Sequence, residues 1–180
     1  MLVCAGREEI ISYATPIGVG LIEASMGLTK LCLRERIEDI IFVGTAGSYS
    51  CDIPMLSLYV SIQAIQIESG FLSEACYTPL DNYIIAEHQI VSRETLEKAL
   101  VNSSNYITTD PNIAEQMWHA GILLENMEFF SVLRVAQEFQ IPACGIFCIT
   151  NYCNANAHQD FLCNHSSAKA KLQDFIERFL

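Results

Sequence analysis

Glu128 and Asn151 are polar residues in places where the surrounding sequence needs none. Glu128 follows Met127 at the start of an apolar stretch with helical spacing, and Asn151 follows Thr150 after the apolar run Ala143–Ile149. A carboxylate accepts hydrogen bonds, whereas a carboxamide both donates and accepts them. Polar side chains at the end of a buried strand lie where open α/β sheets bind ligands. The pair therefore indicates a small-molecule site between this helix and this strand.

The helix that must position Glu128 and the strand that must position Asn151 are consecutive in the chain. The apolar residues after Glu128 have the spacing of a mostly buried helix: Phe130, Val132, Leu133, Val135 and Ala136. Pro142 ends this helix, because the residue before a proline disfavours the helical conformation. Ala143–Ile149 is then almost entirely apolar, as expected of a strand covered on both faces.

Two further segments combine a short apolar strand with a turn of small or charged residues. Ile40–Val43 runs into Gly44–Ser48, where backbone N–H groups and the Thr45 hydroxyl can converge on an anion. Leu2–Ala5 runs into the polar loop Gly6–Glu9. Small residues also suit a tight strand exit, and a charged loop also suits solvent, so the residue types alone leave both interpretations open.

The composition predicts a single domain, residues 1–180, with a large apolar core. Hydrophobic residues make up 51% and charged residues 17% of the chain. No apolar run reaches the roughly 20 residues of a membrane span, and the first residues lack the pattern of a signal peptide. The net charge of −11 disfavours nucleic acid polymers as partners. The eight cysteines include no CxxC pair, which favours reduced thiols, a cytoplasmic location and no metal site.

The order of helical and strand-like segments predicts an α/β fold: a three-layer α/β/α arrangement with a central mixed β-sheet. Ile10–Ala14 and Ile17–Leu21 have the composition of strands. Thr95–Val101 is expected to form a helix. Gly70–His88 has no regular pattern, and we interpret it as an irregular loop over the site or at a subunit contact.

These motifs resemble those of the nucleoside phosphorylase and nucleosidase superfamily, and most closely purine nucleoside phosphorylase. The resemblance rests on Met127-Glu128 before a helix, on Thr150-Asn151 at a strand end, and on Gly44–Ser48, which matches a Gly-Thr/Ser-x-Gly turn of the family. It implies that Glu128 holds ribose hydroxyls, with Met127 beneath the sugar. It also implies that Asn151, beside Thr150, faces the purine base.

The resemblance leaves the attacking nucleophile open. In the alternative that the sequence favours, the chain is a purine nucleoside phosphorylase, a glycosyltransferase of purine salvage. Phosphate, held by Thr45 and Arg7, would attack the sugar and give the free base and ribose 1-phosphate. In a second alternative the chain is a nucleosidase in which Glu9 activates water. In a third it is a catalytically impaired relative that binds nucleosides.

The catalytic role implied for Asn151 is to stabilise negative charge on the departing base. The resemblance also implies a homo-oligomer, because members of the family share sites between subunits. We expect no cofactor beyond the phosphate co-substrate of the first alternative.

Two local features bear on the site without deciding its chemistry. Gly18-Val19-Gly20 opens a helix and resembles a glycine turn of the family, but Glu23 in the first helical turn disfavours a phosphate there. His158 resembles a histidine that approaches the sugar 5′ end in trimeric purine phosphorylases. A lone histidine at a helix start is usually a surface residue, so we leave His158 outside the predicted site.

Overall fold

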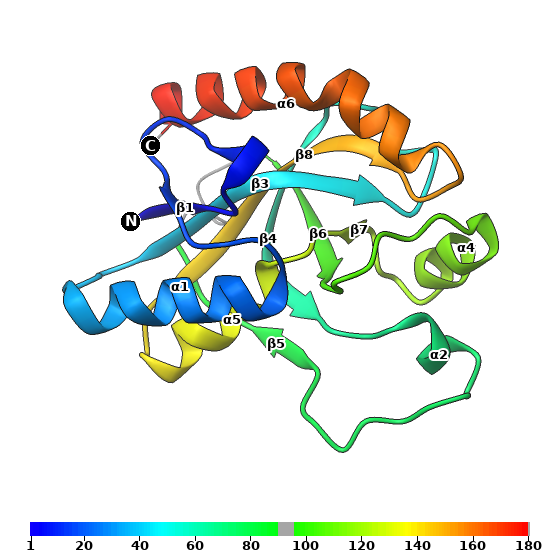
Figure 1. Ribbon diagram of the computed structural model, residues 1–180, viewed down its shortest axis with the longest axis horizontal. Helices are drawn as coiled ribbons and strands as arrows, with labels where there is room; N and C mark the ends of the chain where they lie inside the picture. The colour runs from blue at the N-terminus through cyan, green and yellow to red at the C-terminus, as the bar shows by residue number, and fades with distance from the viewer. Residues whose placement is uncertain (90–95, 180) are drawn as a thin grey trace.

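A mixed eight-stranded sheet organises the protein in this computed structural model, which describes residues 1–89 and 96–179 (Figure 1). The strands are β1 Leu2–Cys4, β2 Thr15–Pro16, β3 Ile40–Ser48, β4 Leu58–Ile65, β5 Tyr83–Ile85, β6 Glu97–Asn102, β7 Leu124–Glu125 and β8 Ala143–Tyr152. Their order is β2-β1-β3-β7-β6-β4-β5. β8 pairs in parallel with β3 and antiparallel with β4. Strands β3, β8, β4, β6 and β7 therefore pair in a closed ring.

Helices cover both faces of the sheet, which confirms the predicted α/β fold with a central mixed sheet (Figure 1). The helical elements are η1 Arg7–Glu9, α1 Gly20–Arg34, α2 Ser69–Leu72, α4 Pro111–His119, α5 Phe129–Glu138 and α6 Ala157–Phe179. α6 lies on one side of β3 and β8, and α1 and α5 pack together on the other side. No helix in residues 1–89 or 96–179 is long and apolar enough to cross a membrane.

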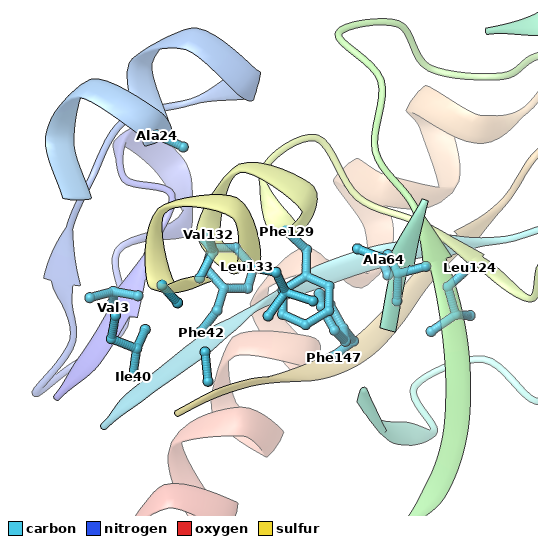
Figure 2. Close-up of a cluster of buried hydrophobic side chains, with 14 of the residues drawn as sticks. Val3, Ala24, Ile40, Phe42, Ala64, Leu124, Phe129, Val132, Leu133 and Phe147 are labelled. Carbon is cyan, nitrogen blue, oxygen red and sulfur yellow. The ribbon is translucent and has the colours of Figure 1, made fainter. Parts of the chain in front are cut away.

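Strands β3 and β8 form the buried centre, because every residue of β3 and every residue of β8 before Tyr152 is buried. Phe42 of β3 and Phe147 of β8 pack against Phe129, the first residue of α5 (Figure 2). The rings of Phe129 and Phe147 meet edge to face, with centroids 5.1 Å apart. A Cβ on Gly145 would lie 2.6 Å from both rings. This packing fixes the start of α5, and Glu128 directly precedes it.

Several segments differ from the secondary structure that the sequence predicts. The helix expected at Thr95–Val101 is wrong: Thr95 lies outside the described residues, and Glu97–Val101 belongs to β6, which pairs in parallel with β4. Its long-range pairing buries Ala99 and Val101 and outweighs the helix propensity of the segment. Ile10–Ala14 contains a turn instead of a strand, and Ile17–Leu21 leads into α1.

The segment Gly70–His88, expected to be an irregular loop, is partly ordered into a strand. Residues of β5 pair antiparallel with β4, with Ile84 opposite Ala64. Ile84 is buried, whereas its neighbours Tyr83 and Ile85 are exposed, as period-two alternation requires. The strand is only three residues long, which is too short to give a clear sequence pattern.

Candidate active site

A cavity of about 310 Å³ opens at the carboxyl ends of β3 and β8. Its size is within the range of small-molecule sites. Its walls come from η1, the ends of β3 and β8, the loop after β6, the junction of β7 with α5, and the start of α6. All seven residues predicted from the sequence line it: Arg7, Glu9, Thr45, Met127, Glu128, Thr150 and Asn151. The structure thus brings these residues together, although they lie far apart in the chain.

A β-bulge directs Asn151 towards the cavity. Along the β3–β8 pair Ala46 lies opposite Ile149 and Gly47 lies opposite Asn151, so Thr150 has no partner residue. A bulge changes the direction of the side chain that follows it. The Thr150 hydroxyl donates to the Asn151 amide oxygen at 3.0 Å, which orients the amide. Gly47 leaves room for it, because a Cβ there would lie 2.9 Å from the amide nitrogen.

Glu128 is held at the start of α5 by contacts on both sides. One carboxylate oxygen accepts a hydrogen bond from the Gly20 N–H of α1 at 2.8 Å. The side-chain oxygen of Asn126 accepts from the N–H groups of Glu128 and Phe129, at 3.0 and 2.9 Å, and so caps the helix. Glu128 is only 2% exposed. Burial, with a smaller contribution from the nearby Glu9 carboxylate, raises the pKa of Glu128 to about 8.

Glu9 and Thr45 form the second polar contact of the cavity. The Thr45 hydroxyl donates to a Glu9 carboxylate oxygen. Burial raises the pKa of Glu9 above its usual value, while hydrogen bonds from the Thr45 side chain and backbone oppose this increase. The two carboxyl groups of Glu9 and Glu128 also repel each other, because both line one cavity. Burial thus raises the pKa of both carboxyl groups, and the hydrogen bonds from Thr45 favour the charged form of Glu9.

The raised pKa of Glu128 predicts a pH-dependent stability that Glu128→Gln should reduce. The native pKa is about 8 and the ordinary value is 4.5, so between these values the native state binds more protons than the unfolded state. The contribution of Glu128 to the free energy of unfolding is fully present below pH 4.5. It falls as the pH rises from 4.5 to about 8, by up to about 1.4 kcal/mol per pH unit. Urea unfolding at about pH 5 and about pH 8 should show a smaller difference for Glu128→Gln than for the wild type. If the free energy of unfolding changed equally with pH in the wild type and in Glu128→Gln, the raised pKa of Glu128 would be contradicted.

Arg7 lines the cavity but is poorly placed to hold a phosphate. Its side chain is 71% exposed and forms an ion pair with Glu23 at 3.5 Å. Among the described residues that line the cavity it is the one arginine or lysine. A phosphate in this cavity would therefore face the Glu9 and Glu128 carboxyl groups with a single, already paired cation.

The N-terminus of α1, which could also bind an anion, is already occupied by side chains of the protein. The Val19 N–H donates to Glu23 at 3.1 Å, and the Gly20 N–H donates to Glu128. The Leu21 N–H donates to the side-chain oxygen of Asn105 at 2.9 Å. These are the groups that an anion would need. The site is therefore built to hold a neutral nucleophile more readily than phosphate.

A family model described as the phosphorylase superfamily matches residues 2–180. The chain belongs to the phosphorylase superfamily. This confirms the family that the Met127-Glu128 and Thr150-Asn151 motifs resemble.

The chain is similar to several proteins that carry the names of nucleosidases or hydrolases. The aminodeoxyfutalosine nucleosidase of Helicobacter pylori is 25% identical over 171 residues, which cover 86% of this chain and 72% of the relative. The native futalosine hydrolase of H. pylori superimposes with a TM-score of 0.82 at 17% identity, over 98% of this chain and 94% of that one. A mutant H. pylori 5′-methylthioadenosine/S-adenosylhomocysteine nucleosidase with 5′-methylthioadenosine in its active site gives a TM-score of 0.80 at 16% identity, over 98% and 95%. The comparison with these two solved structures shows that the chain has the same fold as they do.

The prediction of a purine nucleoside phosphorylase, a glycosyltransferase that uses phosphate, is wrong for this member of the phosphorylase superfamily. The relatives carry names of hydrolytic enzymes, and the nucleosidase alternative fits them better. The occupied N–H groups of α1 and the ion pair of Arg7 with Glu23 give the physical reason. The sequence already placed Glu23 in that first turn, but it did not show that Glu23 also pairs with Arg7.

Several residues that line the cavity were not predicted from the sequence. His158 and Phe161 of α6 line it; His158 is exposed, as expected of a surface residue, and also lies at the cavity wall. Ser104, Tyr106 and Ile107 come from the loop after β6, and the rest include Gly6, Val19, Ala46, Gly47, Glu125, Asn126 and Ala157. The resemblance at His158 was the one sequence signal that pointed to α6. Among the described residues no group of three or more His, Cys, Asp or Glu side chains could hold a metal ion.

Proposed function

We propose that the chain is a nucleosidase that hydrolyses the N-glycosidic bond of a purine nucleoside, with Glu9 as the general base. The proposal rests on the pairing of Glu9 with Thr45 in a cavity that also contains Glu128 and Asn151. The nucleosidase names of the relatives support it. Met127, Thr45 and Thr150 complete the binding surface in this proposal.

Glu9 acts on a water molecule at the face of the sugar. The Thr45 hydrogen bonds hold the carboxylate in place and favour its charged form, while burial makes it more basic than an exposed glutamate. The bond between C1′ and the base nitrogen breaks, and its electron pair leaves with the base. Water oxygen bonds to C1′, and Glu9 takes the water proton. The products are a free sugar and a free base.

Glu128 and Asn151 hold the two halves of the substrate. The Glu128 carboxyl group lies at the start of α5, where it can bind the vicinal hydroxyls of ribose. The Asn151 amide, oriented by Thr150, can donate a hydrogen bond to a ring nitrogen of the purine and so stabilise the charge that the base takes on leaving. A carboxamide has no acidic proton to give, so the departing base receives its proton from solvent.

The observation that favours water over phosphate is the satisfied N-terminus of α1. A phosphorylase must offer its co-substrate free N–H groups or cations, whereas here Glu23, Glu128 and Asn105 accept those N–H bonds. Water does not need free N–H groups or cations to bind. It needs a base to take its proton, and Glu9 lies near Glu128, the residue proposed to bind the sugar.

Incubation of the purified protein with inosine, adenosine and 5′-methylthioadenosine, with and without phosphate, tests the proposal. We expect base release at the same rate in both conditions, with the free sugar as the second product. Release that requires phosphate, with a sugar 1-phosphate as product, would overturn it. Binding of a nucleoside without release of base would favour the catalytically impaired relative.

We also propose that the protein is a homo-oligomer. Ile22, Met26 and Leu33 of α1 are 69%, 55% and 72% exposed and lie on a helix face that the chain itself does not cover. Burial of this face between copies would remove apolar surface from water. Light scattering coupled to size exclusion should give a mass of at least twice 20.1 kDa, and a monomer would contradict the proposal.

A further inference from the structure

One wall of the cavity is a connecting segment with little apolar packing of its own. Ser104–Thr109, called the strap below, connects β6 to α4 (Figure 1). Tyr106 and Ile107 line the cavity, yet they are 77% and 52% exposed. Apolar residues that remain so exposed contribute little burial energy. Hydrogen bonds must therefore set where the strap lies over the cavity.

The Ser104 hydroxyl donates to Glu68 at 2.8 Å, and the Asn105 side chain accepts from the Leu21 N–H at 2.9 Å. Glu125 provides two further attachments. One of its carboxylate oxygens accepts from the Thr108 N–H at 3.0 Å, and the other accepts from the Thr108 hydroxyl at 2.7 Å. The second oxygen also accepts from the Tyr49 hydroxyl at 3.0 Å. Tyr49 in turn accepts from the side-chain amide of Asn102 at 3.3 Å. Hydrogen bonds to a charged acceptor are stronger than those between neutral groups.

The backbone of Glu125 is fixed on both sides by the sheet. It lies opposite Gly47 in the antiparallel pair of β7 with β3, and opposite Asn102 in the parallel pair of β7 with β6. A two-residue strand held between two neighbours gives the carboxylate a rigid base. Through Glu125 the strap is therefore tied to the sheet.

The attachment lies at the end of the cavity where Asn151 lies. A Cβ on Gly47 would be 3.4 Å from Cγ of Glu125 and 2.9 Å from the amide nitrogen of Asn151, so both side chains flank the same glycine. Glu125 and the strap residues Ser104, Tyr106 and Ile107 line the cavity together. A shift of the strap would thus change the shape of the wall beside the base.

We propose that Glu125 is a positioning residue that holds the strap, through Thr108, at the base end of the cavity and so sets the affinity for the nucleoside. The proposal rests on the proposed nucleosidase function for its substrate. Glu125 takes no part in bond breaking, because its carboxylate oxygens are occupied by Thr108 and Tyr49. Its effect is on binding and reaches the substrate through the strap.

The first test compares Thr108→Val with Thr109→Val. Valine keeps the shape of threonine and removes the hydroxyl that donates to Glu125, whereas Thr109 is exposed and lies just outside this contact. Loss of a hydrogen bond to a charged group should raise KM about 10- to 100-fold for Thr108→Val, with kcat nearly unchanged. Thr109→Val should match the wild type. A fall in kcat at constant KM would overturn the positioning role.

A double-mutant cycle tests whether Glu125 acts through Thr108. Glu125→Gln should raise KM at least as much as Thr108→Val, and the double variant should be little worse than Glu125→Gln, because both changes break one contact. Additive effects would show that Glu125 acts by another route and would overturn the proposal. Glu125→Asp, which keeps the charge, should recover part of the affinity.

Hydrogen exchange separates failure of this proposal from failure of the proposed function, because it needs no turnover. In the wild type the Thr108 N–H is bonded to Glu125 and should exchange slowly. Glu125→Gln should speed exchange in residues 104–109 selectively, while β3 and β8 stay protected. Unchanged exchange in the strap would overturn the proposal even if the protein proves to be a nucleosidase. If the protein proves inactive but Glu125→Gln speeds exchange in residues 104–109, the attachment of the strap by Glu125 is supported and the proposed nucleosidase function is refuted.

Discussion

Glu9→Gln should lower kcat for base release by about 10²–10⁴-fold, the usual contribution of a general base. Glutamine has the shape of glutamate and can still accept the Thr45 hydrogen bond with its amide oxygen. It cannot take a proton from water. KM should therefore change little, and the loss should lie in the chemical step. Steady-state kinetics with the best substrate of the panel, beside the exposed control Glu35→Gln, measures the effect.

The pH profile gives the Glu9 prediction a second readout. The pKa of Glu9 is raised above its usual value of 4.5 by burial, so kcat/KM of the wild type should rise with pH through a limb above that value. This limb should disappear in Glu9→Gln, because the variant has no carboxylate to ionise. A variant that keeps wild-type kcat, or keeps the acid limb, would show that Glu9 is not the base.

The parts of the site that the sequence predicted share a local signature. Thr45 and Asn151 each lie in the C-terminal half of a long buried strand, and Glu128 directly precedes a buried helix, so each is a polar residue beside an apolar run. A polar residue beside an apolar run can be recognised in a single sequence, because burial of a strand or helix requires the apolar run. Strands end at one edge of the sheet, so the residues were also expected to meet.

The parts that the sequence did not predict depend on contacts between distant segments. Glu125 follows only three apolar residues, Ile122–Leu124, too few to indicate a buried strand, and its role follows from Thr108 and Tyr49. β7 is two residues long and exists because β3 and β6 lie on either side of it. The expected helix at Thr95–Val101 failed for the same reason, since pairing with β4 decides its conformation.

The choice between phosphate and water also depended on partners that the sequence does not show. Arg7 was the local candidate for phosphate, and only the fold reveals that Glu23 pairs with it. Gly18–Gly20 had the composition of an anion-binding turn, and only the fold reveals that Glu128 accepts the Gly20 N–H. The residue types at an anion site can thus be present while their hydrogen bonds are already used.

Asn151→Ala should lower kcat for purine release by roughly 10²–10³-fold, the cost of removing one donor that stabilises developing charge. The fold should survive, because the hydrogen bonds of the amide are few: it accepts from Thr150 at 3.0 Å and donates to the Tyr152 carbonyl at 3.4 Å. The exposed residue Asn156, in the loop after β8, provides a matched control. Asn156→Ala should keep wild-type kcat for the same nucleoside.

A substrate with a better leaving group shows whether the Asn151 effect comes from the base. p-Nitrophenyl riboside expels a stable phenolate that needs no hydrogen bond from the enzyme, so Asn151→Ala should hydrolyse it nearly as fast as the wild type does. Glu9→Gln should remain slow with this substrate, because water still has to be activated. The two variants thus separate the leaving-group side of the cavity from the water side. Equal losses with both substrates in Asn151→Ala would mean that Asn151 supports the cavity and does not stabilise the departing purine.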